Sequence, residues 1–167
     1  NGFLFEQSGE YWMTGVELEG QPYQVPFYNH PLDLDEVYFE PGVEEFILDT
    51  PHVEFIIAVH PDAGSLPVLA GVNIARVTGR FYAVPTSSAL YVPPSQASSY
   101  NETELPITDC SQATADSPVL WMNIEESAPV VRFDESNPNC IIVGGSDGEE
   151  ILAAADMFVY KILGIIR

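Results

Sequence analysis

Basic residues are scarce in this chain. Its 167 residues contain five Lys and Arg against 25 Asp and Glu, which gives a formal net charge of −20, and no Lys or Arg precedes Arg76. A surface of this charge repels phosphate backbones and anionic lipid headgroups. The composition therefore disfavours nucleic acid and direct membrane-surface binding.

Long apolar runs are also lacking. Neither end holds the 18–20 or so consecutive apolar residues that a bilayer-spanning helix needs, so we expect no membrane insertion by this segment. The longest apolar stretch, from Ile151 to Ile166, is interrupted by Asp156 and Lys161, which is typical of a helix docked on a core. Because the chain begins with Asn1 rather than Met, we expect a further segment upstream of it.

Despite its charge, the chain is 46% hydrophobic and long enough to bury a core. We expect a single domain over residues 1–167, with an acidic lobe at 1–50 and an α/β core at 51–167 as its possible subdivision. Three explanations compete for the acidity: a high-salt habitat, a Ca²⁺ site, and solubility at a crowded cell surface. The last is favoured, because 46% apolar content is high for an extreme halophile.

Hydrophobic periodicity predicts the fold class. Alternating residues over 3–27 predict an antiparallel meander, and the apolar run at 53–59 predicts a central strand. Further strands are expected at 43–48, 81–84, 90–92, 105–109, 119–124, 130–133 and 140–143. One helix is predicted from Ser65, as its cap, to Gly79, as its stop, and a capping box from Ser146 to Glu149 predicts the last. This order predicts an α+β fold with two helices packed on one mixed sheet.

Only two cysteines are present, Cys110 and Cys140, each beside a strand-like run. In an oxidising compartment such a pair usually bridges neighbouring strands, which would stabilise the fold by roughly 3.5 kcal/mol. Two buried free thiols are the alternative. The sequon at Asn101 lies in a loop-like stretch and fits glycosylation of an extracellular protein.

Catalytic and metal-binding candidates are few. His60, Asp62 and Ser65 cluster after the central strand and are candidates for a hydrolytic site, although a turn that leads into a helix cap explains them more simply. Asp33, Asp35 and Glu36 are candidates for Ca²⁺, but the EF-hand pattern is absent and a solvated acidic loop is favoured. No other cofactor is indicated.

Arg76 and Arg80 form the only close basic pair. They are candidates for a contact with the acidic N-terminal third of another copy, while pairing with Glu54 or Asp62 in the same chain is the alternative.

Three segments together resemble a known family. They are residues 26–31 (PFYNHP), residues 57–76 (IAVHPDAGSLPVLAGVNIAR), and residues 139–143 (NCIIV) running on to the final helix. The set is similar to an uncharacterised family of predicted membrane-tethered surface proteins of small-genome archaea. The resemblance implies a location outside the membrane, an anchor upstream of Asn1 and a Cys110–Cys140 pair, but no activity.

The sequence therefore favours a non-enzymatic extracellular domain acting in surface structure, adhesion or self-assembly. Its expected partners are other copies of itself or other surface proteins. The alternative is a secreted or surface-attached hydrolase that uses the His60/Asp62 loop.

Overall fold

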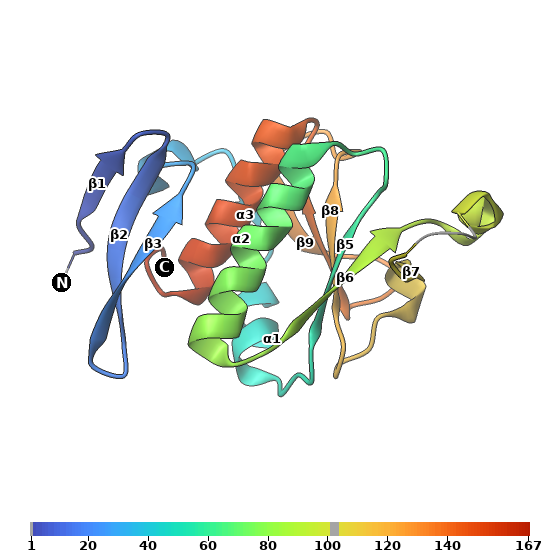
Figure 1. The fold of residues 1–167 in the computed structure, drawn as a ribbon, viewed down its shortest axis with the longest axis horizontal. Coiled ribbons are helices and arrows are strands. Elements are labelled where there is room, and N and C mark those ends of the chain that lie inside the picture. Colours follow the sequence, from blue (N-terminus) through green and yellow to red (C-terminus); the bar gives the residue numbers. More distant parts are fainter. Residues whose placement is uncertain (1, 101–103) are drawn as a thin grey trace.

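Two sheets enclose a layer of helices in the computed structural model, which describes residues 2–100 and 104–167. A three-stranded sheet lies on one side of helices α2 and α3, and a seven-stranded sheet lies on the other (Figure 1). The α+β class predicted from the sequence is confirmed, with two long helices on one face of a mixed sheet.

The small sheet is the predicted antiparallel meander. It consists of β1 (Phe5–Ser8), β2 (Tyr11–Leu18) and β3 (Gln21–Phe27). The two-residue loop between β2 and β3 has positive φ at both Glu19 (52°) and Gly20 (78°). Two left-handed residues in a two-residue loop match the right-handed twist of the flanking strands, so this turn sets the register of the hairpin.

The large sheet has the strand order β4-β9-β10-β8-β5-β6-β7, in which only the β9–β10 pair is antiparallel. The predicted central strand is confirmed, because β5 pairs with β8 on one side and β6 on the other. The strands are β4 (Tyr38–Phe39), β5 (Phe55–Val59), β6 (Thr86–Tyr91), β7 (Ile107–Thr108), β8 (Val119–Asn123), β9 (Val130–Phe133) and β10 (Cys140–Gly144). Since β4 belongs to this sheet, the first 50 residues are divided between the two sheets.

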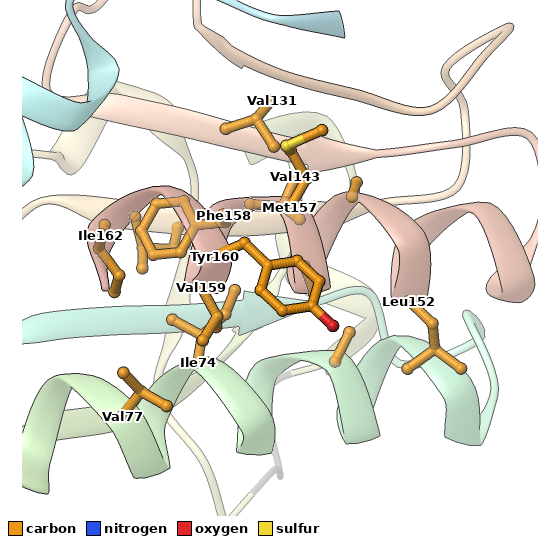
Figure 2. Close-up of a cluster of buried hydrophobic side chains, with 14 of the residues drawn as sticks. Ile74, Val77, Val131, Val143, Leu152, Met157, Phe158, Val159, Tyr160 and Ile162 are labelled. Carbon is orange, nitrogen blue, oxygen red and sulfur yellow. The ribbon is translucent and has the colours of Figure 1, made fainter. Parts of the chain in front are cut away.

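The middle layer consists of α2 (Ser65–Tyr82) and α3 (Gly148–Ile162), which lie side by side (Figure 1). Nearly every residue of α3 from Ile151 onward is buried, because both sheets and α2 cover it. Figure 2 shows Ile74 of α2 with Leu152 and Val159 of α3 in the core between the helices. The shorter helices are α1 (Val43–Asp49) and the 3₁₀ turns η1 (Pro31–Asp33), η2 (Pro94–Tyr100) and η3 (Cys110–Gln112).

Two predicted strands are wrong. Residues 43–48 form α1, because Val43 and Ile47 are buried four residues apart on one helical face. Residues 81–84 do not form a strand, because α2 continues through Gly79 to Tyr82 and ends at Ala83, whose φ is +54°. Contacts outside the helix favour this extension, since Phe81 packs edge-on against Tyr23 of the small sheet.

Two predicted caps are also wrong. The N-cap of α2 is Gly64, with no side-chain hydrogen bond, so Ser65 is the first helical residue. The N-cap of α3 is Asp147, whose carboxylate accepts a hydrogen bond from the nitrogen of Glu150. The Glu150 carboxylate in turn accepts hydrogen bonds from the nitrogen and hydroxyl of Ser146. Asp147 and Glu150 therefore occupy the positions of a capping box, one residue later than predicted, but the Glu150 carboxylate binds Ser146, the residue before the N-cap, instead of the N-cap itself.

Candidate functional site

A pocket of about 320 Å³ lies at the carboxyl ends of the parallel strands β5, β6 and β8. Residues that directly follow these strands, or end them, line it: His60 after β5, Tyr91 at the end of β6, and Asn123 at the end of β8. The remaining lining residues are Asp62, Pro93, Gln96, Trp121, Ile124 and Glu125. This edge of a parallel sheet is where open α/β folds usually bind ligands.

Another hollow, of about 500 Å³, lies against the small sheet. Its lining comes from the N-terminal segment and strands β1 to β3, with Glu6, Glu17 and Gln24 as its polar side chains. All of these residues belong to one hairpin meander. We therefore place the candidate site at the large sheet, where loops from three separate strands bring mixed chemistry together.

One wall of the pocket is an aromatic stack. The rings of Tyr91 and Trp121 are parallel, with 3.7 Å between centroids and 3° between planes. They come from β6 and β8, which are separated by β5, so the rings meet above the middle strand. The β5 residue beside Trp121 is Ala58, which is buried in the same cluster as both rings. Its methyl side chain leaves room for the stack.

The disulfide lies in the same cluster as the aromatic wall. Cys110 and Cys140 are bonded, with 5.2 Å between their Cα atoms, which confirms the predicted pair and excludes free thiols. The bond does not join two strands, because Cys110 begins η3 and Cys140 begins β10. It instead holds the η3 segment against the sheet face that the helices leave uncovered. Asn137 reinforces this attachment by donating hydrogen bonds to the carbonyls of Cys110 (2.7 Å) and Ala113 (3.0 Å).

The β5–α2 loop contributes an imidazole and a carboxylate. The backbone nitrogen of Asp62 donates a hydrogen bond to Nδ1 of His60 at 3.1 Å, so a neutral His60 ring carries its proton on Nε2. The hydroxyl of Tyr100 donates to the Asp62 carboxylate at 3.5 Å. The sequence-predicted candidates His60 and Asp62 are thus both in the pocket lining.

The end of β8, the strand beside β5, contributes a further part of the lining. Asn123 is buried, and its side-chain oxygen accepts a hydrogen bond from the backbone nitrogen of Glu125 at 3.0 Å. Its amide nitrogen donates to Glu126 at 3.3 Å, and Glu126 forms an ion pair with Arg132 at 2.7 Å. Within residues 2–100 and 104–167 this is the one ion pair, so Glu126 is neutralised locally whereas the pocket carboxylates Asp62 and Glu125 have no cationic partner there.

Several carboxylates act on the Tyr91 hydroxyl of the aromatic wall. Burial raises the pKa of the Tyr91 hydroxyl above its usual value of 10, and a hydrogen bond with the backbone of Cys110 opposes that shift. The carboxylates of Asp109, Asp134 and Glu125 raise the pKa of Tyr91 further. Tyr91 is therefore a neutral phenol in acidic surroundings.

The hydrolytic cluster is only partly assembled. Ser65 is exposed at the start of α2 and does not line the pocket. Among the described residues of the lining there is no Ser, Thr or Cys. A nucleophile–base–carboxylate arrangement is consequently not formed by the three residues that the sequence singled out.

The other predicted sites stay apart from the pocket. Asp33, Asp35 and Glu36 are exposed, and in the described part of the chain no three His, Cys, Asp or Glu are grouped to hold a metal ion. The predicted glycosylation site, Asn101, lies outside the described residues.

The two candidate interaction residues lie on the side of α2 that meets the small sheet. The guanidinium of Arg80 lies 4.8 Å from the ring centroid of Tyr23, in a cation–π contact, and Arg76 borders a small cavity with Asp156. The alternative in-chain pairing with Glu54 or Asp62 is not observed among the described ion pairs.

Sequence reasoning missed most of the pocket, including Tyr91, Gln96, Trp121, Asn123 and Glu125. One signal was present, since polar residues directly follow two apolar strands, at His60 and at Asn123. Neighbouring parallel strands place such residues close together at one edge of the sheet. The sequence does not give the strand order, so it does not show that these two strands are neighbours. The aromatic stack had no sequence signal, because its two residues come from strands that do not pair.

Comparisons with models of protein families, with curated proteins and with solved structures found no match to this chain. Over the part of the chain that the structure describes, no helix is long and apolar enough to cross a bilayer.

Proposed function

We propose that this chain is a non-enzymatic recognition domain that acts outside the cell, in surface structure, adhesion or assembly. The observation that carries the proposal is the pocket at the carboxyl ends of β5, β6 and β8, whose Tyr91–Trp121 wall is clustered with the disulfide. Its partners are surface proteins or other copies of the chain. An anchor upstream of residue 1 would hold it at the membrane.

Two features support an extracellular location. A disulfide that packs in the core persists in oxidising compartments and is rare in the cytosol. The net charge of −20 favours solubility at a crowded surface.

Binding is favoured over catalysis because the walls of the pocket are held in a fixed arrangement. Its wall is a rigid stack of two rings, and Asn123 is held by hydrogen bonds at both ends of its amide. Preorganised walls of this kind lower the entropic cost of holding a ligand.

The test is saturable binding of the purified domain to envelope fragments of the organism that produces it. We expect Trp121→Ala to weaken binding about tenfold or more, as expected for loss of an aromatic anchor. Tyr38→Ala removes an exposed aromatic from β4, at the far edge of the sheet, and should bind like the wild type. Gln96→Arg should also weaken binding, because the larger side chain blocks the exposed rim of the pocket. Since it leaves the aromatic wall unchanged, the same loss in this variant would show that the effect of Trp121→Ala is not due to misfolding. Unsaturable binding, or equal binding by all four proteins, would contradict the proposal.

A second candidate function is the hydrolase. The observation in its favour is that His60 and Asp62 share the pocket with Asn123 and Glu125, which come from a different strand. Its test is turnover of ester, peptide and glycoside substrates. Hydrolysis that His60→Gln or Asp62→Asn abolishes, with the fold intact, would replace the recognition proposal with the enzymatic one.

A further inference from the structure

Carboxylates dominate the charge of the pocket lining. Asp62 and Glu125 are the carboxylates of its lining, and they follow two neighbouring strands, β5 and β8. Among the described residues no Lys or Arg lines it, and Arg132, which follows in β9, is paired with Glu126 at 2.7 Å. The pocket therefore presents uncompensated negative charge to whatever enters it.

The aromatic wall adds a second kind of attraction to the same ligand class. Tyr and Trp rings attract cations through the negative face of the π-system, and Trp is the strongest of the natural side chains in this respect. Trp121 is half-buried and lines the pocket together with the buried Tyr91. Proteins bind ammonium groups against the faces of aromatic rings; because Tyr91 and Trp121 stack on one another, the outer faces of the stack are the ones left for a cation.

The charge of the whole molecule acts in the same direction. A net charge of −20 on one domain raises the local concentration of cations and repels anions. Near the wall, the carboxylates of Asp109, Asp134 and Glu125 raise the pKa of Tyr91 in addition to burial, in line with acidic surroundings. Neutral ligands such as saccharides would gain nothing from it.

We propose that the pocket binds an organic cation, an ammonium or guanidinium group, between the Tyr91–Trp121 wall and the carboxylates of Asp62 and Glu125. The inference rests on the proposed function and names its ligand chemistry. The cation is supplied either by a Lys or Arg side chain of a surface protein or by a free amine. Since the carboxylates are exposed, each contributes modestly, and affinity comes from the wall and the two charges together.

The experiment follows the indole N–H signal of Trp121 by NMR, assigned with a Trp12→Phe variant because the chain has two Trp. The probes are tetramethylammonium, Nα-acetyl-lysine amide, methyl glucoside and acetate, each titrated at constant ionic strength. We expect the two cations to shift the signal saturably, and methyl glucoside and acetate to leave it unchanged. Tighter binding of acetyl-lysine amide than of tetramethylammonium would indicate a protein side chain as the source, and equal or tighter binding of tetramethylammonium would indicate a free ammonium compound.

A matched pair of variants separates the pocket from the overall charge. Glu125→Gln removes one charge in the pocket, and we expect Kd for the cations to rise roughly two- to fivefold. Glu10→Gln removes one charge from an exposed turn of the small sheet, across the helix layer, and should leave Kd unchanged. Added NaCl should weaken binding of both cations.

Three results would overturn the ligand assignment: a shift by methyl glucoside at equal or lower concentration, equal effects of the two variants, or no shift by either cation. If Trp121→Ala still abolishes envelope binding while no cation binds, the ligand class is wrong and the recognition function stands. If cations bind the pocket but the domain does not bind envelope, the recognition function is wrong and the cation site stands.

Discussion

The carboxylate of Asp156, on α3, accepts a hydrogen bond from the backbone nitrogen of Asn29 at 2.7 Å, although 127 residues separate the two. The same oxygen accepts hydrogen bonds from the backbone nitrogen of Tyr28 (2.9 Å) and the side-chain nitrogen of Asn29 (3.0 Å). One turn further along α3, the Tyr160 hydroxyl donates to the Asn29 carbonyl at 2.7 Å, and the Tyr160 ring stacks on Phe27. These contacts attach the small sheet to the helix layer.

The first prediction follows from the burial of Asp156. Burial raises its pKa from 3.8 to about 7, although hydrogen bonds from Asn29 and Tyr28 oppose that shift. The folded state therefore binds this proton more tightly than the unfolded state, whose pKa is about 4. The stabilisation that protonated Asp156 contributes is fully present below about pH 4 and is lost as pH rises to about 7. Above that pH this group no longer changes the free energy of unfolding. We expect Asp156→Asn to flatten the dependence of unfolding free energy on pH between 5 and 8, measured by urea denaturation.

The control for this effect is Asp35→Asn, which removes the same charge from an exposed position. Because the chain as a whole is acidic, its global repulsion also weakens as pH falls, and both variants share that contribution. The wild type should lose at most a few kcal/mol more than Asp156→Asn between pH 5 and 8. Identical pH profiles for the two variants would show that Asp156 is not the titrating group.

The second prediction concerns the disulfide. Replacing Cys110 and Cys140 together by Ser should lower the free energy of unfolding by roughly 3–4 kcal/mol, because the unfolded chain loses its crosslink. The same change should loosen the Tyr91–Trp121 wall, which is buried with the disulfide in one cluster, and so weaken cation binding. Alkylation of the native, unreduced protein should label no thiol, and labelling of two thiols would contradict the bond.

The elements that the sequence predicted well are those with a strong hydrophobic pattern. Alternation in the meander indicates which side chains are buried, because each residue's face follows from the period of two. The apolar runs of β5, β8 and β10 indicate strands that are covered on both faces. The short helix α1 was misassigned because its seven residues carry too few turns for a helical period to stand out.

The pocket and the small-sheet junction depend on information that is not local. Asp156 interrupts the apolar pattern of α3, and from sequence it only excluded a membrane anchor. Its partners at residues 28 and 29 follow from the way the small sheet folds over the helices. In the same way, the reason for a small side chain at Ala58 is visible only when Tyr91 and Trp121 are seen to meet above β5.

The third prediction concerns cations in solution. At −20 the folded chain is destabilised by its own repulsion, so added NaCl should raise the melting temperature through screening. Within the described residues no three His, Cys, Asp or Glu gather to bind a metal ion. We therefore expect CaCl₂ and NaCl to have equal effects at matched ionic strength. A further increase with millimolar CaCl₂ would reveal a specific site, and Asp33→Asn with Asp35→Asn would then show whether the acidic loop forms it.

The fourth prediction compares two glycines of α2. A methyl group on Gly71 would lie 2.5 Å from Cγ2 of Ile57, a methyl attached directly to the branched Cβ of this β5 residue and so held close to the backbone. Gly71→Ala therefore forces the helix off the sheet. On Gly79 the nearest atom would be 4.0 Å away, in ordinary contact distance. Alanine stabilises a helix interior by about 0.5–1 kcal/mol relative to glycine, so Gly79→Ala should raise the free energy of unfolding by that amount. Gly71→Ala should lower it by about 1–3 kcal/mol, because overpacking outweighs the same gain. Urea denaturation measures both, and a shift of the same sign in the two variants would show that α2 does not pack against β5 at Gly71.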